Sequence, residues 1–277
     1  MESSTWNMIW DIILVIAPYV IGGIISLIGL VLYIFSKQRR LLKFIGVDNN
    51  QRRIIVYLSS LLIPRGSALG FDGKPRSYQG ITIPIEELSI SYPLTKSLAI
   101  DIFENVPPFI RNPLKDRFAL FRRISIDTNA SPMNEKDIDF CTGSIITVGS
   151  QGYNIVTNYC VSRNLCQMQI TQNGTVIEII KGRYKGEILR PPSTQHDIAI
   201  LEKLVDESHQ NTTIIIGAGL GVVGTMGAIQ YLINHWEDLY KTYEDRGFSL
   251  ALQFGPIGSQ PMEDLLKGSV IRRLPED

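Results

Sequence analysis

The clearest indication of the fold is the stretch Thr213–Trp236, TIIIGAGLGVVGTMGAIQYLINHW. It opens with a β-branched run, Thr213–Ile216, which predicts a short buried strand. A glycine-rich turn follows, and the residues from about Thr225 to beyond Trp236 predict a helix. In parallel sheets, ligands bind outside the carboxyl ends of the strands, where such turns lie. The stretch therefore predicts an α/β fold with a ligand site near this turn.

The turn carries the spacing Gly219-x-Gly221-x-x-Gly224, and Thr225 then opens the helix. Glycine lets a backbone turn tightly and approach a ligand without a Cβ in the way. The first N–H groups of a helix have no partner within the helix, so we expect them to attract an anion such as a phosphate. The alternative is a tight turn in which the glycines serve packing alone.

A dinucleotide-dependent dehydrogenase is not expected, because of the residues that follow this helix. That fold needs an acidic residue at the end of the next strand, where it binds the ribose. The next predicted strand, Phe248–Phe254, runs instead into Gly255-Pro256-Ile257-Gly258, which contains no carboxylate. The remaining residues, 255–277, are too few for the rest of such a domain.

The charges of the 277-residue chain are balanced, with 27 basic and 27 acidic residues. No global positive field favours nucleic acid, so no direct nucleic-acid binding is expected. The three cysteines, Cys141, Cys160 and Cys166, have neither CxxC spacing nor histidines at metal-ligand spacing. The sequence predicts free thiols in a reducing compartment and no metal site.

An uncharged run, residues 12–36, is longer than the roughly 20 apolar residues that cross a bilayer as a helix. Asp11 precedes this run, and a basic cluster follows it: Lys37, Arg39, Arg40 and Lys43. Because a basic flank stays on the cytoplasmic side, the N-terminus is expected outside and the rest of the chain in the cytoplasm. The sequence thus predicts a single-pass protein of the inner (plasma) membrane, with the lipid bilayer as a partner.

The predicted organisation has four parts. They are a short extracytoplasmic N-terminus (1–11), the transmembrane helix (12–36), a basic juxtamembrane linker (37–51) and a cytoplasmic α/β domain (52–277). Gly22 and Ser26 lie one turn apart in the predicted transmembrane helix, and small residues at this spacing let two helices approach closely. A homo-oligomer is therefore expected.

The first strand of the α/β domain is predicted from a β-branched run that ends at Ser59 and Ser60. The segment Pro64–Gly80 that follows is predicted to be a long glycine-rich loop. Loops of this length are often functional, so Arg65 and Arg76 are candidate ligand contacts. The alternative is a mobile surface loop whose charges are solvated.

Pro84 opens a predicted helix whose first turn contains Glu86 and Glu87. Acidic residues at this position usually serve to stabilise the helix N-terminus. Alternatively, one of the two could act as a catalytic base or bind a ribose hydroxyl.

A second strand–turn–helix unit is predicted over residues 143–161. Its turn is Gly149-Ser150-Gln151-Gly152-Tyr153-Asn154, and a helix Asn154–Val161 follows. Since all these turns lie at the carboxyl ends of strands, they can converge on one pocket. The residues predicted to bind the ligand are Ser59, Ser60, Arg65, Arg76, Gly149, Ser150, Gly152, Asn154, Gly219, Gly221, Gly224 and Thr225.

The remaining segments complete the predicted fold. Two strand-like runs within Cys166–Lys181, around Asn173-Gly174, predict an inserted β-hairpin. Asp197–Val205 fits a helix or a strand, and we favour a strand paired beside Thr213–Ile216. The predicted fold class is α/β: an N-terminal transmembrane helix followed by a Rossmann-like, mostly parallel sheet domain with this inserted hairpin.

In plan, the cytoplasmic part resembles the SLOG superfamily of Rossmann-like nucleotide-sensing domains in bacterial signalling. The resemblance rests on Gly149-Ser150 after one strand and on Gly224-Thr225 at the start of a helix, and it covers about half the chain. It implies a nucleotide-derived ligand. In the phosphoribohydrolase branch of that family a catalytic acid often follows the Gly-Thr pair, but here Met226, Gly227 and Ala228 follow it.

Three functions are compatible with these features. The first is a membrane-anchored sensor or effector that binds a nucleotide-derived ligand and signals through helix association, as in bacterial nucleotide-signalled antiviral defence. The second is a membrane-tethered enzyme that processes a nucleotide or NAD, with Glu86 or Glu87 as its catalytic group. The third is a scaffold in which the glycine turns are purely structural. Neither a cofactor nor a catalytic residue is assigned from the sequence.

Overall fold

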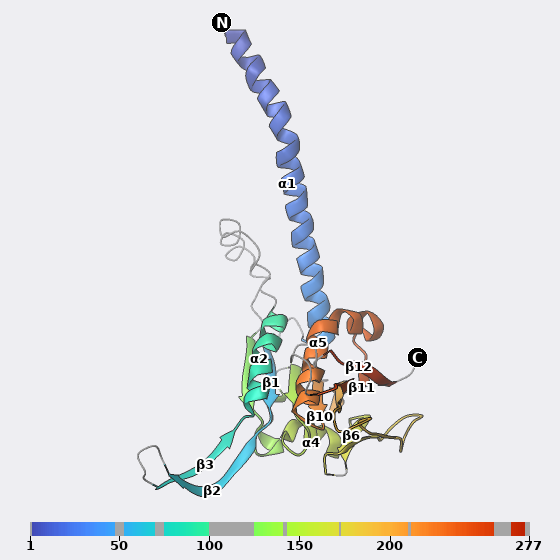
Figure 1. Cartoon of the computed structure of the whole chain (residues 1–277). Helices are drawn as coiled ribbons and strands as arrows, with labels where there is room; N and C mark the ends of the chain where they lie inside the picture. The colour runs from blue at the N-terminus through green and yellow to red at the C-terminus, as the bar shows by residue number, and fades with distance from the viewer. Residues whose placement is uncertain are drawn as a thin grey trace. The chain divides into compact units, whose positions relative to one another are not determined.

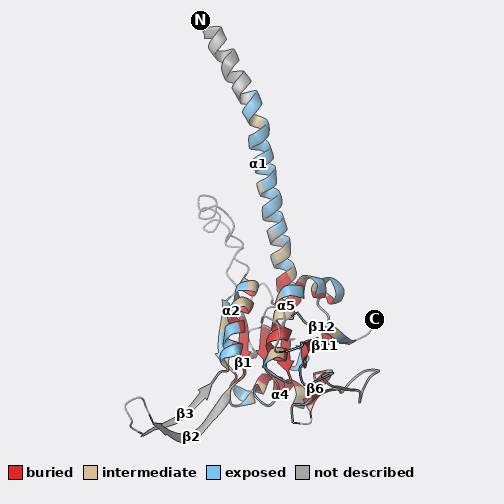
Figure 2. Cartoon of the chain, in the orientation of Figure 1, coloured by how far each residue is buried: buried red, intermediate tan, exposed pale blue. Residues whose placement is uncertain are grey.

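The computed structural model describes residues 2–47, 53–69, 75–99, 125–140, 143–171, 173–209, 212–257 and 267–274. The chain divides into two units, Met1–Arg40 and Leu41–Asp277. The first unit belongs to helix α1, Glu2–Ile45, and its described side chains, such as Leu14 and Tyr19, are largely exposed (Figure 2). The second unit contains the α/β fold.

The predicted transmembrane helix is not supported. Within the described residues, no helix has a span that is both long and apolar enough to cross a bilayer. The uncharged run 12–36 does not form a helix of its own. It lies inside α1, which starts before Asp11 and continues through the basic cluster to Ile45. The prediction of a single-pass protein of the inner (plasma) membrane, which rested on that run, is therefore wrong.

A seven-stranded sheet, in the order β12-β11-β9-β10-β5-β1-β4, forms the centre of the second unit (Figure 1). Its strands are β1 Arg53–Leu58, β4 Ser125–Ala130, β5 Gly143–Val148, β9 Asp197–Asp206, β10 Thr212–Gly219, β11 Phe248–Phe254 and β12 Ser269–Leu274. The pairs β4–β1, β1–β5 and β5–β10 are parallel, whereas β10–β9, β9–β11 and β11–β12 are antiparallel. The α/β class is confirmed, but the sheet is mixed rather than mostly parallel.

The antiparallel part follows from a short connection. Asp197–Val205 is a strand, as favoured from the sequence, and β9 is joined to β10 through the single 3-10 turn η4, Glu207–His209. Parallel neighbours need a crossover of a dozen or more residues, so a link this short allows only antiparallel pairing. The register sets Gly219 opposite Ala199.

Helices cover both faces of the sheet. Helices α2 (Ile85–Ala99) and α5 (Val222–Tyr243) pack against each other on one face, and α4 (Ile155–Ser162) lies on the other (Figure 1). Successive strand residues point to opposite faces. In β1, Ile54 and Val56 therefore face the core that contains α2 and α5, while Ile55 and Tyr57 face the core that contains α4. A three-stranded sheet contributes to the second core: β6 Met168–Thr171, β7 Val176–Ile179 and β8 Ile188–Leu189.

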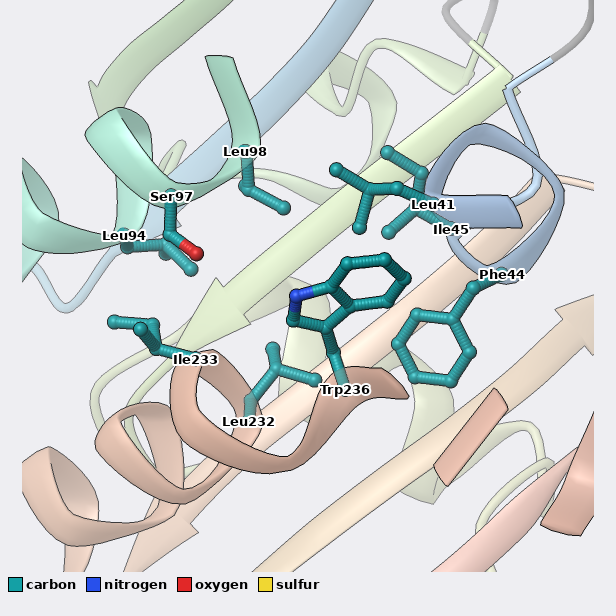
Figure 3. Close-up of a pocket in the computed structure, with 9 residues that line it drawn as sticks. All are labelled: Leu41, Phe44, Ile45, Leu94, Ser97, Leu98, Leu232, Ile233 and Trp236. Carbon is teal, nitrogen blue, oxygen red and sulfur yellow. The ribbon is translucent and has the colours of Figure 1, made fainter. Parts of the chain in front are cut away.

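The end of α1 belongs to the first of these cores. Leu41, Phe44 and Ile45 are buried and lie beside Trp236 of α5 (Figure 3). The ring centroid of Phe44 lies 6.5 Å from that of Trp236 and 6.1 Å from that of Phe248. A cavity of about 10 Å³ remains among these side chains, which is room for about one water molecule. It reflects core packing and is too small for a ligand.

Two segments form hairpins that differ from the structures predicted from the sequence. The predicted loop Pro64–Gly80 contains an antiparallel hairpin instead, with strands β2 (Leu61–Leu69) and β3 (Pro75–Thr82). The hairpin predicted around Asn173-Gly174 is confirmed as β6–β7. In this hairpin Thr171 pairs with Val176, so the connection is longer than a two-residue turn.

Candidate functional site

The turns after β1, β5 and β10 meet at the carboxyl edge of the sheet and line one cleft of about 340 Å³. Helix α2 comes after β1 on one face of the sheet, and α4 follows β5 on the other. Such a divergence between neighbouring parallel strands is where α/β proteins bind ligands. The cleft is lined by Ser59, Pro84, Glu87, Gly149, Ser150, Tyr153, Gly219, Leu220, Gly221, Val222 and Thr225.

A buried carboxylate from α2 lies in the cleft beside the end of β1. Glu87 is 7% exposed, and its Oε2 accepts a hydrogen bond from the backbone N–H of Ser59 (2.7 Å). Burial raises the pKa of Glu87, and the hydrogen bonds from Ser59 oppose this shift only in part. Glu86, its neighbour on α2, is exposed and does not line the cleft. Of the two acidic residues considered from the sequence, the structure brings only Glu87 to the site.

The turn after β5 requires glycine at its first position. Gly149 has φ +113°, and a Cβ at this position would lie 1.9 Å from Oγ of Ser59. Next to it, the carbonyl of Ser150 accepts hydrogen bonds from the N–H groups of Tyr153 and Asn154. These bonds shape the turn so that Tyr153, which is 56% exposed, lines the cleft.

Asn154 is a structural residue of this turn rather than part of the cleft lining. Its Oδ1 accepts from the N–H of Val156 at 3.0 Å, as the N-cap of α4. Its Nδ2 donates to the carbonyls of Tyr57 and Val148, at 3.0 Å each. The side chain therefore ties the ends of β1 and β5 to the start of α4.

Asn154→Ala is expected to lower the free energy of unfolding by about 2 kcal/mol. It removes the helix cap and leaves two buried carbonyls without this donor. Urea denaturation followed by circular dichroism measures the change. Ser150→Ala is a suitable control in the same turn, because Ser150 shapes the turn through its backbone carbonyl. Equal stability of the Asn154→Ala variant and the parent would contradict the capping role.

The turn between β10 and α5 is closed by the side chain of Thr225. Its Oγ1 accepts from the N–H of Gly219 and donates to the carbonyl of Gly221, both at 3.0 Å. A Cβ on Gly219 would lie 2.3 Å from the backbone nitrogen of Thr225. Glycine is therefore required at position 219 by close approach of the backbone to itself.

The first turn of α5 already holds an anionic group, which belongs to the chain itself. The carboxylate of Asp197 accepts from the N–H of Gly221 (3.1 Å) and from that of Gly224 (2.7 Å). A Cβ on either glycine would lie within 3 Å of that carboxylate, at 2.8 Å for Gly221 and 2.9 Å for Gly224. Burial raises the pKa of Asp197, although the hydrogen bonds from the glycines and Ile198 lower it. The expectation that these N–H groups await an external anion is therefore wrong at Gly221 and Gly224.

Sequence reasoning missed Asp197, but one signal could have found it. Once β9 and β10 are taken as a hairpin in which Gly219 pairs with Ala199, the same register sets Asp197 opposite Gly221. An acidic residue at that position lies next to the N-terminus of the helix, where a negative charge is favourable. Tyr153, Leu220 and Val222 were also missed as lining residues.

The structure brings together half of the residues predicted to bind the ligand. Those that line the cleft are Ser59, Gly149, Ser150, Gly219, Gly221 and Thr225. Four others lie beside the cleft without lining it: Ser60, Gly152, Asn154 and Gly224. Arg65 and Arg76 lie in β2 and β3, and their side chains are outside the described part of the structure.

The described part of the chain shows neither a metal-binding cluster nor a cysteine in the lining of the cleft. Among the described residues, no group of three or more His, Cys, Asp and Glu side chains could hold a metal ion. Cys160 and Cys166 are free and buried on the α4 side of the sheet, and Cys141 lies outside the described residues.

No protein-family model matches this chain. No curated protein and no solved structure matches it either.

Proposed function

We propose that this chain is a binding protein that holds a nucleotide-derived ligand, through its nucleoside part, in the cleft at the carboxyl edge of the sheet. The observation that carries the proposal is the meeting of the turns after β1, β5 and β10 around one cleft of about 340 Å³. This volume is within the range of about 300–1,000 Å³ that is usual for small-molecule sites.

The chemistry of the lining supports a nucleoside in particular. A ribose is rich in hydroxyl donors, and the carboxylate of Glu87 is a strong acceptor within the cleft. A base is flat and largely apolar on its faces, and the exposed ring of Tyr153 offers it a stacking surface. Leu220 and Val222 add apolar contacts on the α5 side. A ligand of this class would use both the polar and the apolar parts of the lining.

Titration calorimetry of the full-length chain with adenosine, guanosine, cytidine and uridine tests the proposal. We expect at least one of them to bind, and Glu87→Gln to weaken that binding about 10- to 100-fold through loss of a charged hydrogen-bond acceptor. Glu86→Gln is the matched control, because Glu86 is an exposed neighbour on the same helix. Binding of none of the four nucleosides, or equal binding by the Glu87 variant, would count against the proposal.

A second candidate function is processing of a nucleotide or NAD, and the position of Glu87 favours it. A buried carboxyl group with a raised pKa in a cleft is a common general acid or base. Incubation of the chain with NAD, followed by reverse-phase chromatography, tests this alternative. New products that form with the parent chain but not with Glu87→Gln would support an enzyme. If NAD stays unchanged, ligand binding without catalysis is the function that remains.

A further inference from the structure

The acidic groups near the cleft have no basic counterpart in its described lining. Among the described residues that line the cleft, Glu87 is the only one with a charged side chain. Directly behind Gly221, the carboxylate of Asp197 is held by two backbone N–H groups of the turn before α5. The cleft therefore has one carboxylate in its described lining, that of Glu87, and a second, that of Asp197, bound to the turn before α5 without lining the cleft.

Asp197 occupies the position that a bound phosphate takes in other glycine turns of this type. A phosphate at such a turn is held by the N–H groups at the start of the helix and by the positive end of the helix dipole. Here the N–H groups of Gly221 and Gly224 already donate to Asp197, and its negative charge offsets the positive helix end. Both positions are glycine because a Cβ would collide with this carboxylate.

We infer that Asp197 sets the ligand specificity of the cleft: it replaces the phosphate in the glycine turn, so that the cleft prefers ligands without a phosphate. This inference rests on the proposed function and names the part of a nucleotide that the site accepts. A phosphate in the cleft would lie near the carboxylate of Glu87, with no cation in the described lining, and the N–H groups of Gly221 and Gly224 that could hold it already donate to Asp197. Like charges repel even at a protein surface. The preferred ligand is a nucleoside, or a derivative whose group near α5 is uncharged or cationic.

The test compares each of the four nucleosides with its 5′-monophosphate by titration calorimetry on the full-length chain. Low salt keeps the repulsion between charged groups strong. We expect the nucleoside to bind at least about tenfold more tightly than its monophosphate. Equal or tighter binding of the monophosphate would overturn the inference and leave the proposed function standing. Binding of neither compound would overturn the proposed function, and the inference with it.

Asp197→Asn removes the charge and keeps an oxygen that can accept from the turn. We expect the affinity for the monophosphate to rise about tenfold, while that for the nucleoside stays the same. Asp238→Asn is the matched control, because it makes the same change in net charge at an exposed site on α5. If Asp197→Asn folds and still prefers the nucleoside over the monophosphate to the same degree, Asp197 does not set the specificity of the cleft. If it does not fold, the comparison of ligands on the parent chain decides the question.

Discussion

Gly219→Ala is expected to lower the free energy of unfolding by about 3 kcal/mol or more. The added Cβ would lie 2.3 Å from the nitrogen of Thr225, 2.5 Å from the carbonyl carbon of Gly224 and 2.8 Å from the oxygen of Gly221. Overpacking a well-packed site usually costs about 1–3 kcal/mol, because side chains can shift. Here all three neighbours are backbone atoms of one tight turn, so the turn itself would have to open. Urea denaturation followed by circular dichroism measures this loss.

Gly152→Ala is the matched control for this substitution. Gly152 lies in the turn after β5, and a Cβ there would meet no atom within 4 Å. The control is expected to change the free energy of unfolding by less than about 0.5 kcal/mol. If the two alanine variants were equally stable, close backbone approach would not be the reason for glycine at position 219.

The stability of the fold is expected to fall as the pH rises from 5 to 8, by up to about 4 kcal/mol. Glu202 of β9 is 2% exposed, and burial raises its pKa to about 8, partly offset by a hydrogen bond from the N–H of Gln167. The folded state therefore binds a proton that the unfolded chain releases near the ordinary pKa of a glutamate. A raised acidic pKa stabilises the fold fully below the unfolded value, and this contribution is lost as the pH rises through the folded value.

Glu202→Gln tests this expectation, because the neutral amide has no proton to lose in this range. Urea denaturation at pH 5, 6, 7 and 8 should show a steep decline for the parent and a much flatter profile for the variant. Parallel profiles for the two proteins between pH 5 and 8 would rule out Glu202 as the source.

Elements with a uniform local pattern could be predicted from the sequence. The strand Phe248–Phe254 has the predicted bounds, and Asp197–Val205 is a strand beside Thr213–Ile216 as favoured. Buried strands of β-branched and aromatic residues have a signal that depends on their own residues alone. The meeting of turns around one cleft could also be anticipated, because parallel strands end at the same edge of a sheet.

Features that depend on distant partners could not be predicted in the same way. Asp197 is connected to the glycines that it contacts only through the register of the β9–β10 hairpin, and not by the residues next to it in sequence. Asn154 looks like a ligand contact because it follows a glycine turn, but its buried bonds to Tyr57 and Val148 make it structural. The β2–β3 hairpin did have a local signal, since Asp72-Gly73 is a favoured hairpin dipeptide, and the length of the glycine-rich segment obscured it.

The end of α1 decides where the smallest autonomously folding piece of this chain begins. Leu41, Phe44 and Ile45 belong to the hydrophobic core of the second unit, which starts at Leu41. A variant that lacks the whole of α1 would also lack Phe44, the aromatic neighbour of Trp236 and Phe248, and its core would be open to water. A truncation before Leu41 would keep every one of these side chains. The boundary of the folding piece therefore lies inside an uninterrupted helix, within the basic cluster that follows the uncharged run, and no loop marks it.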